Sequence, residues 1–95
     1  MLNSNKISNS VIIGSHTSDN ADECPNGVSC VSGTGYNNPY PSFWAVIITI
    51  ATNSPSYKQQ LALPFANGYN SIAYRVYDAC NWYPWKYFAG STNIS

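Results

Sequence analysis

The stretch Ile72-Ala73-Tyr74-Arg75-Val76-Tyr77 decides the fold, together with Trp82-Tyr83-Pro84-Trp85-Lys86 a few residues later. The first stretch has the alternation typical of a β-strand and contains the only arginine of the chain. The second places two tryptophans three positions apart, around a proline that a central strand excludes because proline has no backbone N–H. Clustered aromatic residues in a chain with only 8% charged residues favour a stacking surface or a compact aromatic core over a reaction centre.

Further strand segments, separated by turn residues, lie on both sides of this stretch. Residues 44–52 are the strongest strand candidate, because valine, isoleucine and threonine favour extended backbone. Residues 57–65 alternate and contain Pro64, which predicts an edge position or a bulge. Asn67-Gly68 predicts a hairpin turn, because both residues tolerate positive φ. The strands that the sequence predicts cover residues 11–13, 28–32, 44–52, 57–65, 69–77 and 82–89.

The other segments predict one helical turn, one long loop and a linker. The helical turn is expected at residues 18–23, capped by Thr17 or Ser18, with acidic residues near its positive N-terminal end. Residues 33–42 are rich in Gly, Asn and Pro and predict a loop. Residues 1–15 are expected to be a linker, and residues 16–95 one small domain. The fold class is therefore mainly β, an antiparallel β-meander or barrel-like domain with one short N-terminal helical turn.

The low charge of the chain limits the classes of binding partner that we expect. Four basic and four acidic residues balance each other, and the basic ones are scattered at Lys6, Lys58, Arg75 and Lys86. Nucleic acid is not expected, because phosphate binding depends on clustered Lys and Arg. The polar residues are Asn, Ser, Tyr, Gln and Thr, which suit neutral, hydroxyl-bearing ligands such as glycans, and equally suit an oligomer that hides much of its surface. Membrane insertion is not expected either, since no segment approaches roughly 18 apolar residues, and residues 1–6 lack the pattern of a signal peptide.

The ionisable residues do not form a catalytic pattern. Glycoside hydrolysis needs two carboxylates about 5 to 10 Å apart, whereas Asp19, Asp22 and Glu23 crowd into one expected turn. The only histidine, His16, lies beside the linker, and no nucleophile motif accompanies it. We therefore expect no catalytic residue, no metal site, no cofactor and no enzymatic activity.

The chain contains three cysteines, an odd number. The spacing of Cys24 and Cys30 allows a disulfide that closes a small loop around residues 25–27. The lack of an export signal instead favours free thiols.

The loop at residues 33–41 is the preferred recognition element. Surface loops carry much of protein binding, and tyrosine with asparagine and glycine gives contact area at low entropy cost. The candidate ligand contacts in this loop are Tyr36, Asn37, Asn38 and Tyr40. The alternative is an ordered loop that packs its tyrosines on the sheet.

The aromatic cluster near the C-terminus supplies the other candidate contacts, Arg75, Trp82 and Tyr83. Tyr83 should point away from its neighbours if the strand is regular, which makes it the best exposed candidate. Trp85 and Trp44 are expected in the core. Arg75 is expected to be structural, with its donors satisfied by Asp78, by carbonyl groups or by an aromatic face, unless it lies in a groove and binds an acidic glycan.

The order of these elements resembles one known family. An acidic turn leads into a glycine and a strand at residues 19–29, an Asn38-Pro39 loop follows, and then come an apolar strand at 44–50 and a Gln-rich strand at 59–62. The segment closes with Ala73-Tyr74-Arg75 and the pattern W-x-x-W-K at residues 82–86. In this order and spacing, from about His16 to Phe88, the chain resembles the pyocin-knob-like domains of bacteriophage and tailocin tail fibres. It departs from them at residues 78–81, where the family usually carries Gly and Ser.

The resemblance implies a small, non-catalytic β-domain at the distal end of a trimeric fibre of the virion. Such a domain contributes to attachment to the host surface, here with a cell-surface glycan as the expected ligand. Residues 1–15 would then be the end of the fibre shaft. Two alternatives stay open from the sequence: a structural cap that trimerises the fibre, and a monomeric carbohydrate-binding module.

Overall fold

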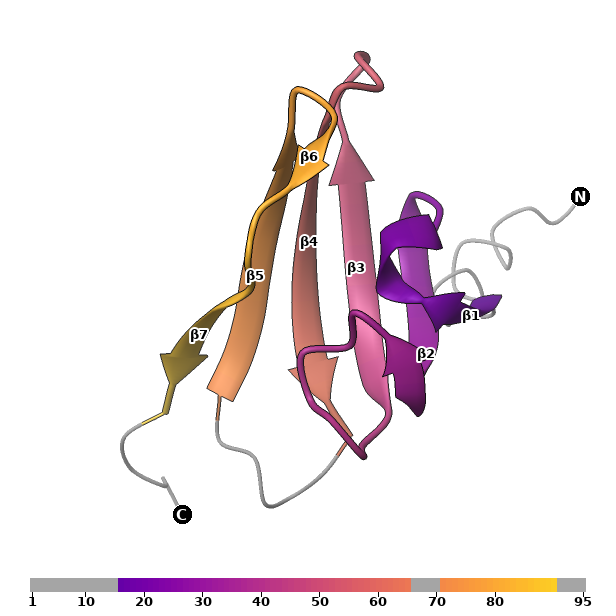
Figure 1. Cartoon of the computed structure of the whole chain (residues 1–95), viewed down its shortest axis with the longest axis vertical. Helices are drawn as coiled ribbons and strands as arrows, with labels where there is room; N and C mark the ends of the chain where they lie inside the picture. The colour runs from indigo at the N-terminus through magenta and orange to yellow at the C-terminus, as the bar shows by residue number, and fades with distance from the viewer. Residues whose placement is uncertain (1–15, 66–70, 91–95) are drawn as a thin grey trace, which may run out of the picture.

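The computed structural model describes residues 16–65 and 71–90, and within them seven strands form one curled sheet shaped like a half-barrel (Figure 1). The elements in chain order are β1 (His16–Asn20), the 3-10 turn η1 (Ala21–Glu23), β2 (Gly27–Tyr36), β3 (Ala45–Ala51), β4 (Tyr57–Pro64), β5 (Ser71–Asp78), β6 (Asn81–Trp82) and β7 (Lys86–Ala89). The strand order is β1-β2-β3-β4-β5-β6, and β7 also pairs with β5. The prediction of a mainly β domain with one short helical turn is confirmed.

Strands β2 to β5 form the predicted antiparallel meander, with each strand paired to the next along the chain. β1 departs from it, because it pairs parallel with β2, placing His16 opposite Ser29. The connection between these two strands contains η1, which lies in front of β2 in Figure 1. Parallel neighbours need a crossover of this kind, since a tight hairpin can join only antiparallel strands.

The N-terminal boundaries differ from the sequence prediction. Residues 16–20 are a strand, and the helical turn is confined to Ala21–Glu23. The cap is Asn20, whose Oδ1 accepts a hydrogen bond from the backbone N–H of Asp22 at 3.0 Å. The hydroxyl of Ser18 instead donates to the carbonyl oxygen of Asn20 at 2.9 Å. Thr17 and Ser18 are therefore wrong as caps, because both belong to the paired strand β1.

Strand β2 continues through residues 33–36, where the sequence predicts a loop. Gly33 explains the difference: a Cβ there would lie 2.5 Å from the backbone carbon of Ser42 and 2.6 Å from the nitrogen of Phe43. Glycine thus allows the returning loop to pass directly against the strand. The backbone N–H of Ser42 donates to the carbonyl oxygen of Gly33 at 3.0 Å and fixes this contact.

The other predicted strands are confirmed within one or two residues, except the last. Residues 82–89 divide into β6 and β7 around Pro84, which has no N–H for the ladder. Pro64 ends β4, which lies between β3 and β5, so the predicted edge position is wrong. The predicted strand at 11–13 and the Asn67-Gly68 turn lie outside the described residues.

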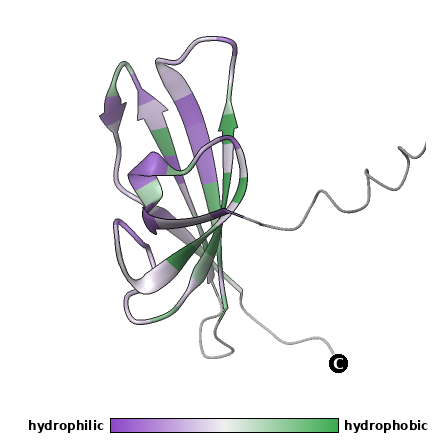
Figure 2. Ribbon diagram, turned by 90° about the vertical axis from the view of Figure 1, so that its right-hand side faces the viewer, coloured by the Kyte–Doolittle hydropathy of each residue, from purple (hydrophilic) through white to green (hydrophobic). Residues whose placement is uncertain are grey.

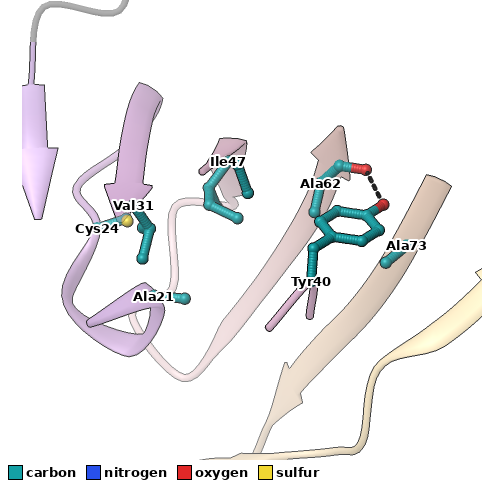
Figure 3. Packing of buried hydrophobic residues seen from close by; sticks show 8 residues of the cluster. Ala21, Cys24, Val31, Tyr40, Ile47, Ala62 and Ala73 are labelled. Atoms are coloured by element: carbon teal, nitrogen blue, oxygen red, sulfur yellow. Dashed lines mark hydrogen bonds between the residues drawn. The ribbon is translucent and has the colours of Figure 1, made fainter. Parts of the chain in front are cut away.

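One face of the sheet, called the inner face from here on, carries a small core. Its alternating positions include Ala45 and Ile47 of β3, Ala62 of β4 and Ala73 of β5, all fully buried. Figure 3 shows Tyr40 from the loop between β2 and β3 lying over Ala62 and Ala73. The buried apolar cluster consists of Ala21, Cys24, Val31, Tyr40, Ala45, Ile47, Ala62 and Ala73. The loop and η1 therefore close the inner face.

Candidate functional site

Arg75 lies on the inner face and is the centre of a buried polar cluster. Its side chain is only 4% exposed. Its Nε donates to Gln60 Oε1 at 2.8 Å, and its Nη2 donates to Asp22 Oδ1 at 2.7 Å. Gln60 in turn donates to the carbonyl oxygen of Ala21 at 2.7 Å and to the hydroxyl of Thr49 at 3.1 Å. These contacts fasten η1 to strands β3, β4 and β5.

Two tryptophan rings enclose the guanidinium group. The Arg75 Cζ atom lies 3.8 Å from the ring centroid of Trp82 and 4.5 Å from that of Trp85. Trp82 also contacts the ring of Tyr77, with centroids 5.0 Å apart. The indole N–H of Trp85 donates to the carbonyl oxygen of Asn37 at 2.9 Å, which connects the segment before β7 with the loop that follows β2. A buried cation is stabilised by such ring faces, because their quadrupole is negative at the centre.

This environment assigns Arg75 a structural role. Burial lowers the pKa of Arg75, while the hydrogen bond and the charge of Asp22 oppose that effect, and an arginine stays protonated in proteins. The expected aromatic contact is confirmed, but the expected partner Asp78 is wrong, because the carboxylate comes from Asp22, 53 residues away in the sequence. With Arg75 this deeply buried, the alternative that its side chain lies in an open groove and binds an acidic glycan is also wrong.

The loop after β2 divides into core and surface residues. Tyr40 is fully buried, and its hydroxyl donates to the carbonyl oxygens of Ala62 and Ser71, each at 3.0 Å. Tyr40 as a surface ligand contact is therefore wrong. The amide of Asn38 is occupied within the loop: Nδ2 donates to the carbonyl oxygens of Ser32 and Phe43 at 2.9 Å, and Oδ1 accepts from the backbone N–H of Tyr40 at 2.7 Å.

Tyr36 and Asn37 are the exposed residues of the predicted loop site. Tyr36 ends β2 and its side chain is 72% exposed. Asn37 adopts a positive φ of 60°, which asparagine tolerates better than most residues, and its Nδ2 donates to Asn20 Oδ1 at 2.9 Å. The carbonyl oxygen of Asn37 accepts the hydrogen bond from Trp85, and the ring of Trp85 in turn contacts Arg75, which also stacks on Trp82. Tyr36 extends into solvent.

Tyr83 lies on the opposite face of the sheet from Trp82, in agreement with the alternation expected from the sequence. Tyr77 pairs with Trp82, and Tyr74 pairs with Lys86, so the three residues 83–85 face only the two residues 75 and 76 of β5. This bulge surrounds Pro84. The backbone N–H of Tyr83 donates to the carbonyl oxygen of Val76 at 2.9 Å, and its side chain remains 53% exposed.

A pocket of about 300 Å³ opens beside this bulge. Its lining residues are Tyr74, Arg75, Val76, Asp78, Tyr83, Pro84 and Lys86. The aromatic rings and the proline supply flat apolar surface, and one carboxylate and one amine supply hydrogen-bonding groups of opposite charge. The volume lies at the lower end of the range for small-molecule sites. Asp78 is the one carboxylate in this lining.

Sequence reasoning alone missed most of this pocket. It singled out Tyr83 and Arg75 but not Tyr74, Asp78 or Lys86, because only the register of β5 against β6 and β7 brings them together. It likewise placed Trp44 in the core, whereas Trp44 is 47% exposed, one residue before β3. That prediction is wrong because the neighbouring Ala45 takes the inner position.

The other sites that the sequence considered can be placed as well. Cys24, Cys30 and Cys80 are free thiols, with Cys24 buried and Cys80 exposed. Within residues 16–65 and 71–90, no three His, Cys, Asp or Glu side chains gather to hold a metal ion. In the same ranges, no helix is long and apolar enough to span a membrane. In comparisons with protein-family models, curated proteins and solved structures, nothing matches this chain.

Proposed function

We propose that this chain is a non-enzymatic attachment module that binds a host cell-surface glycan in the pocket beside Tyr83. The observation that carries the proposal is the pocket itself, with Tyr74, Tyr83 and Pro84 as apolar walls and Asp78 and Lys86 as polar groups. Ligand sites combine apolar surface with a few polar groups in this way. The C–H face of a sugar ring stacks on an aromatic side chain, and its hydroxyl groups hydrogen-bond to the polar ones.

The rigid surroundings of the pocket support this proposal. Behind its wall, Arg75 is held by Asp22, Gln60 and two tryptophan rings on the inner face. β5 is therefore fixed in place, and the backbone hydrogen bond from Tyr83 to Val76 anchors the bulge to it. A site on a fixed strand loses little conformational entropy when a ligand binds, which increases affinity.

The biological setting of the proposal is the tip of a bacteriophage tail fibre of the virion, with three copies of the chain forming a homotrimer in each fibre. This part rests on the resemblance of the sequence to pyocin-knob-like domains. The runner-up is a purely structural cap of the fibre, and a monomeric carbohydrate-binding module is the third possibility. A binding experiment separates the attachment module from the cap.

The test compares Tyr83→Ala with the matched variant Tyr36→Ala, using an array of bacterial surface oligosaccharides and whole host cells. Both residues are exposed tyrosines, but only Tyr83 lines the pocket. We expect Tyr83→Ala to weaken glycan binding by at least about tenfold, the effect of losing roughly 1.4 kcal/mol of contact energy. Thermal stability should stay nearly unchanged in both variants.

Three outcomes would contradict the proposal. Binding that is lost in Tyr36→Ala but retained in Tyr83→Ala would move the site to the loop after β2. Unfolding of Tyr83→Ala would mean that this tyrosine supports the fold. No binding of the unaltered protein to any glycan or cell would favour the structural cap.

A further inference from the structure

The face of the sheet opposite the core, called the outer face from here on, is strongly apolar. Alternation along the paired strands places nine apolar side chains on it: Val28 and Cys30 of β2, Val46, Ile48 and Ile50 of β3, Leu61 and Leu63 of β4, Ile72 of β5 and Phe88 of β7. The same face also carries Gln59 of β4, Tyr74 and Asp78 of β5 and Lys86 of β7. Ile50 is 59% exposed, Phe88 56% and Ile72 40%. In the edge view of Figure 2, η1 and the loop after β2 lie on the other side of the sheet.

The two faces divide the apolar residues in an unusual way. On the inner face, Ile47 pairs with Ala62, and Ala62 pairs with Ala73. On the outer face, the rows one residue away pair Ile48 with Leu61 and Val46 with Leu63. The small residues are therefore inside the folded chain, and many of the large aliphatic ones are left facing outward. Monomeric proteins rarely expose apolar patches of this kind, and larger ones mark interaction sites.

We propose that the outer face is the surface through which copies of this chain associate, so that another copy of the chain covers it. The first argument is charge. The nine apolar residues carry no charge, and the charged residues that alternation places on this face, Asp78 of β5 and Lys86 of β7, lie on its β5–β7 side, away from Val46 and Ile48 of β3. In an oligomer in which every copy buries this face, its apolar centre meets apolar surface and leaves no buried charge without a partner.

The second argument is area. Five strands of four to ten residues (β2, β3, β4, β5 and β7), at about 3.3 Å per residue and about 4.8 Å between strands, give a projected face of roughly 600 Å² in all. The relief of the side chains makes the accessible area larger than this projection. Stable interfaces bury about 800 Å² on each partner, so the outer face has the size that association requires. Sheets pack face to face at about 10 Å, with side chains of the two faces interdigitating.

The proposed interface and the glycan pocket are neighbours but not the same site. The interface is centred on β3 and β4, whereas the pocket lies on β5 and at the bulge between β6 and β7; its residue Tyr74 pairs with Leu61 of the interface. Association through the centre of the face would leave the pocket at the rim of the assembly. The self-association proposal does not depend on glycan binding, and its test uses a different measurement.

The test is the mass in solution of the full chain, measured by light scattering during size-exclusion chromatography over a range of concentrations. We expect a multiple of 10.4 kDa. Ile48→Lys places a charge at the centre of the face and should raise the dissociation constant by at least about thirtyfold, as central interface residues do. Ile50→Lys, at a position already 59% exposed, tests the same point if Ile48→Lys fails to fold.

The matched control is Tyr36→Lys, which adds the same charge at the end of β2, where Tyr36 lies opposite Asn20 of β1 rather than opposite β3. This variant should keep the mass of the unaltered protein. An unaltered protein that stays at 10.4 kDa at every concentration would overturn the proposal, as would lysine variants that keep the oligomeric mass.

The free thiols provide a second measurement. Cys30 lies on the outer face, and Cys80 is exposed in the turn after β5. In the oligomer, a maleimide reagent should modify Cys80 quickly and Cys30 slowly, and Cys30 should become faster in Ile48→Lys. A monomer in which Cys30 is still protected would mean that a segment of the same chain covers the face, and it would overturn self-association.

Discussion

Removal of the Asp22 carboxylate is the most direct perturbation of the inner face. In Asp22→Ala, the Arg75 guanidinium keeps its bond to Gln60 and its two ring contacts, but loses the 2.7 Å hydrogen bond of the ion pair. Breaking a fully buried ion pair costs about 3–5 kcal/mol. The side chain of Asp22 is 35% exposed, so water replaces part of the lost interaction. We therefore expect a loss of roughly 1.5–2.5 kcal/mol in the free energy of unfolding.

The assay is a double-mutant cycle with Arg75→Met, followed by tryptophan fluorescence during urea unfolding. Arg75→Met retains much of the aliphatic volume but leaves Gln60 Oε1 without its 2.8 Å donor, and it should cost about 3 kcal/mol. Once Arg75 is absent, Asp22→Ala should cost almost nothing further. The coupling energy should then equal the cost of Asp22→Ala alone, roughly 1.5–2.5 kcal/mol. All four proteins are compared at one concentration and in one oligomeric state, because association shifts the apparent stability.

Two results would refute this reasoning. A cost of Asp22→Ala below about 0.5 kcal/mol would mean that the pair behaves as a surface salt bridge. Fully additive costs would mean that Asp22 stabilises η1 by its position near the N-terminal end of the turn, independently of Arg75. Either result would mean that the Asp22–Arg75 pair, whose members are 53 residues apart in the sequence, does not hold η1 against β5.

Three further predictions concern the core and its pH dependence. Tyr40→Phe removes the hydroxyl that bonds the carbonyl oxygens of Ala62 and Ser71, and it should cost about 1–2 kcal/mol in chemical unfolding. Gly33→Ala forces a Cβ to within 2.5 Å of backbone, and it should lower the melting temperature by several degrees, whereas Thr34→Ala should not. Burial raises the pKa of the Cys24 thiol above its ordinary value of 9.0. The folded state therefore keeps a proton that the unfolded state loses, and stability should fall as pH rises above about 9. Cys24→Ala should show a shallower fall over the same pH range.

Local sequence signals predicted the central strands and their antiparallel pairing, but not the partner of β1 or the full extent of β2. β3 and β4 follow from β-branched and alternating residues, whereas residues 82–89 were predicted as one strand and divide into β6 and β7 around Pro84. The parallel pairing of β1 did not follow, because parallel register depends on where the crossover docks and leaves no periodic signal. The sequence did not predict the extension of β2, because glycines such as Gly33 and Gly35 usually indicate a loop. Only the structure shows that Gly33 allows the backbone of Ser42 to lie directly against the strand.

The candidate site was predictable only in part, for a similar physical reason. The contact of Arg75 with an aromatic face follows from the need of a lone guanidinium for partners. The choice of Asp22 over the nearby Asp78 does not follow, because it depends on η1 folding back over the inner face. Composition marked Tyr40 as a surface contact, but its hydroxyl finds two carbonyl oxygens inside and so allows complete burial.

The difference in side-chain size between the two faces of the sheet explains why so small a domain contains a buried polar cluster. Four of the eight residues of the buried apolar cluster are alanines, which bury little apolar area, so hydrophobic burial alone stabilises the contact with η1 weakly. The Arg75 cluster supplies directional contacts instead, and these specify one arrangement of η1, β5 and the two tryptophans. The larger aliphatic residues remain for the outer face. If copies associate there, most of the hydrophobic stabilisation arises on assembly, and the Ile48→Lys monomer should unfold at a lower temperature than the oligomer although its inner face is intact.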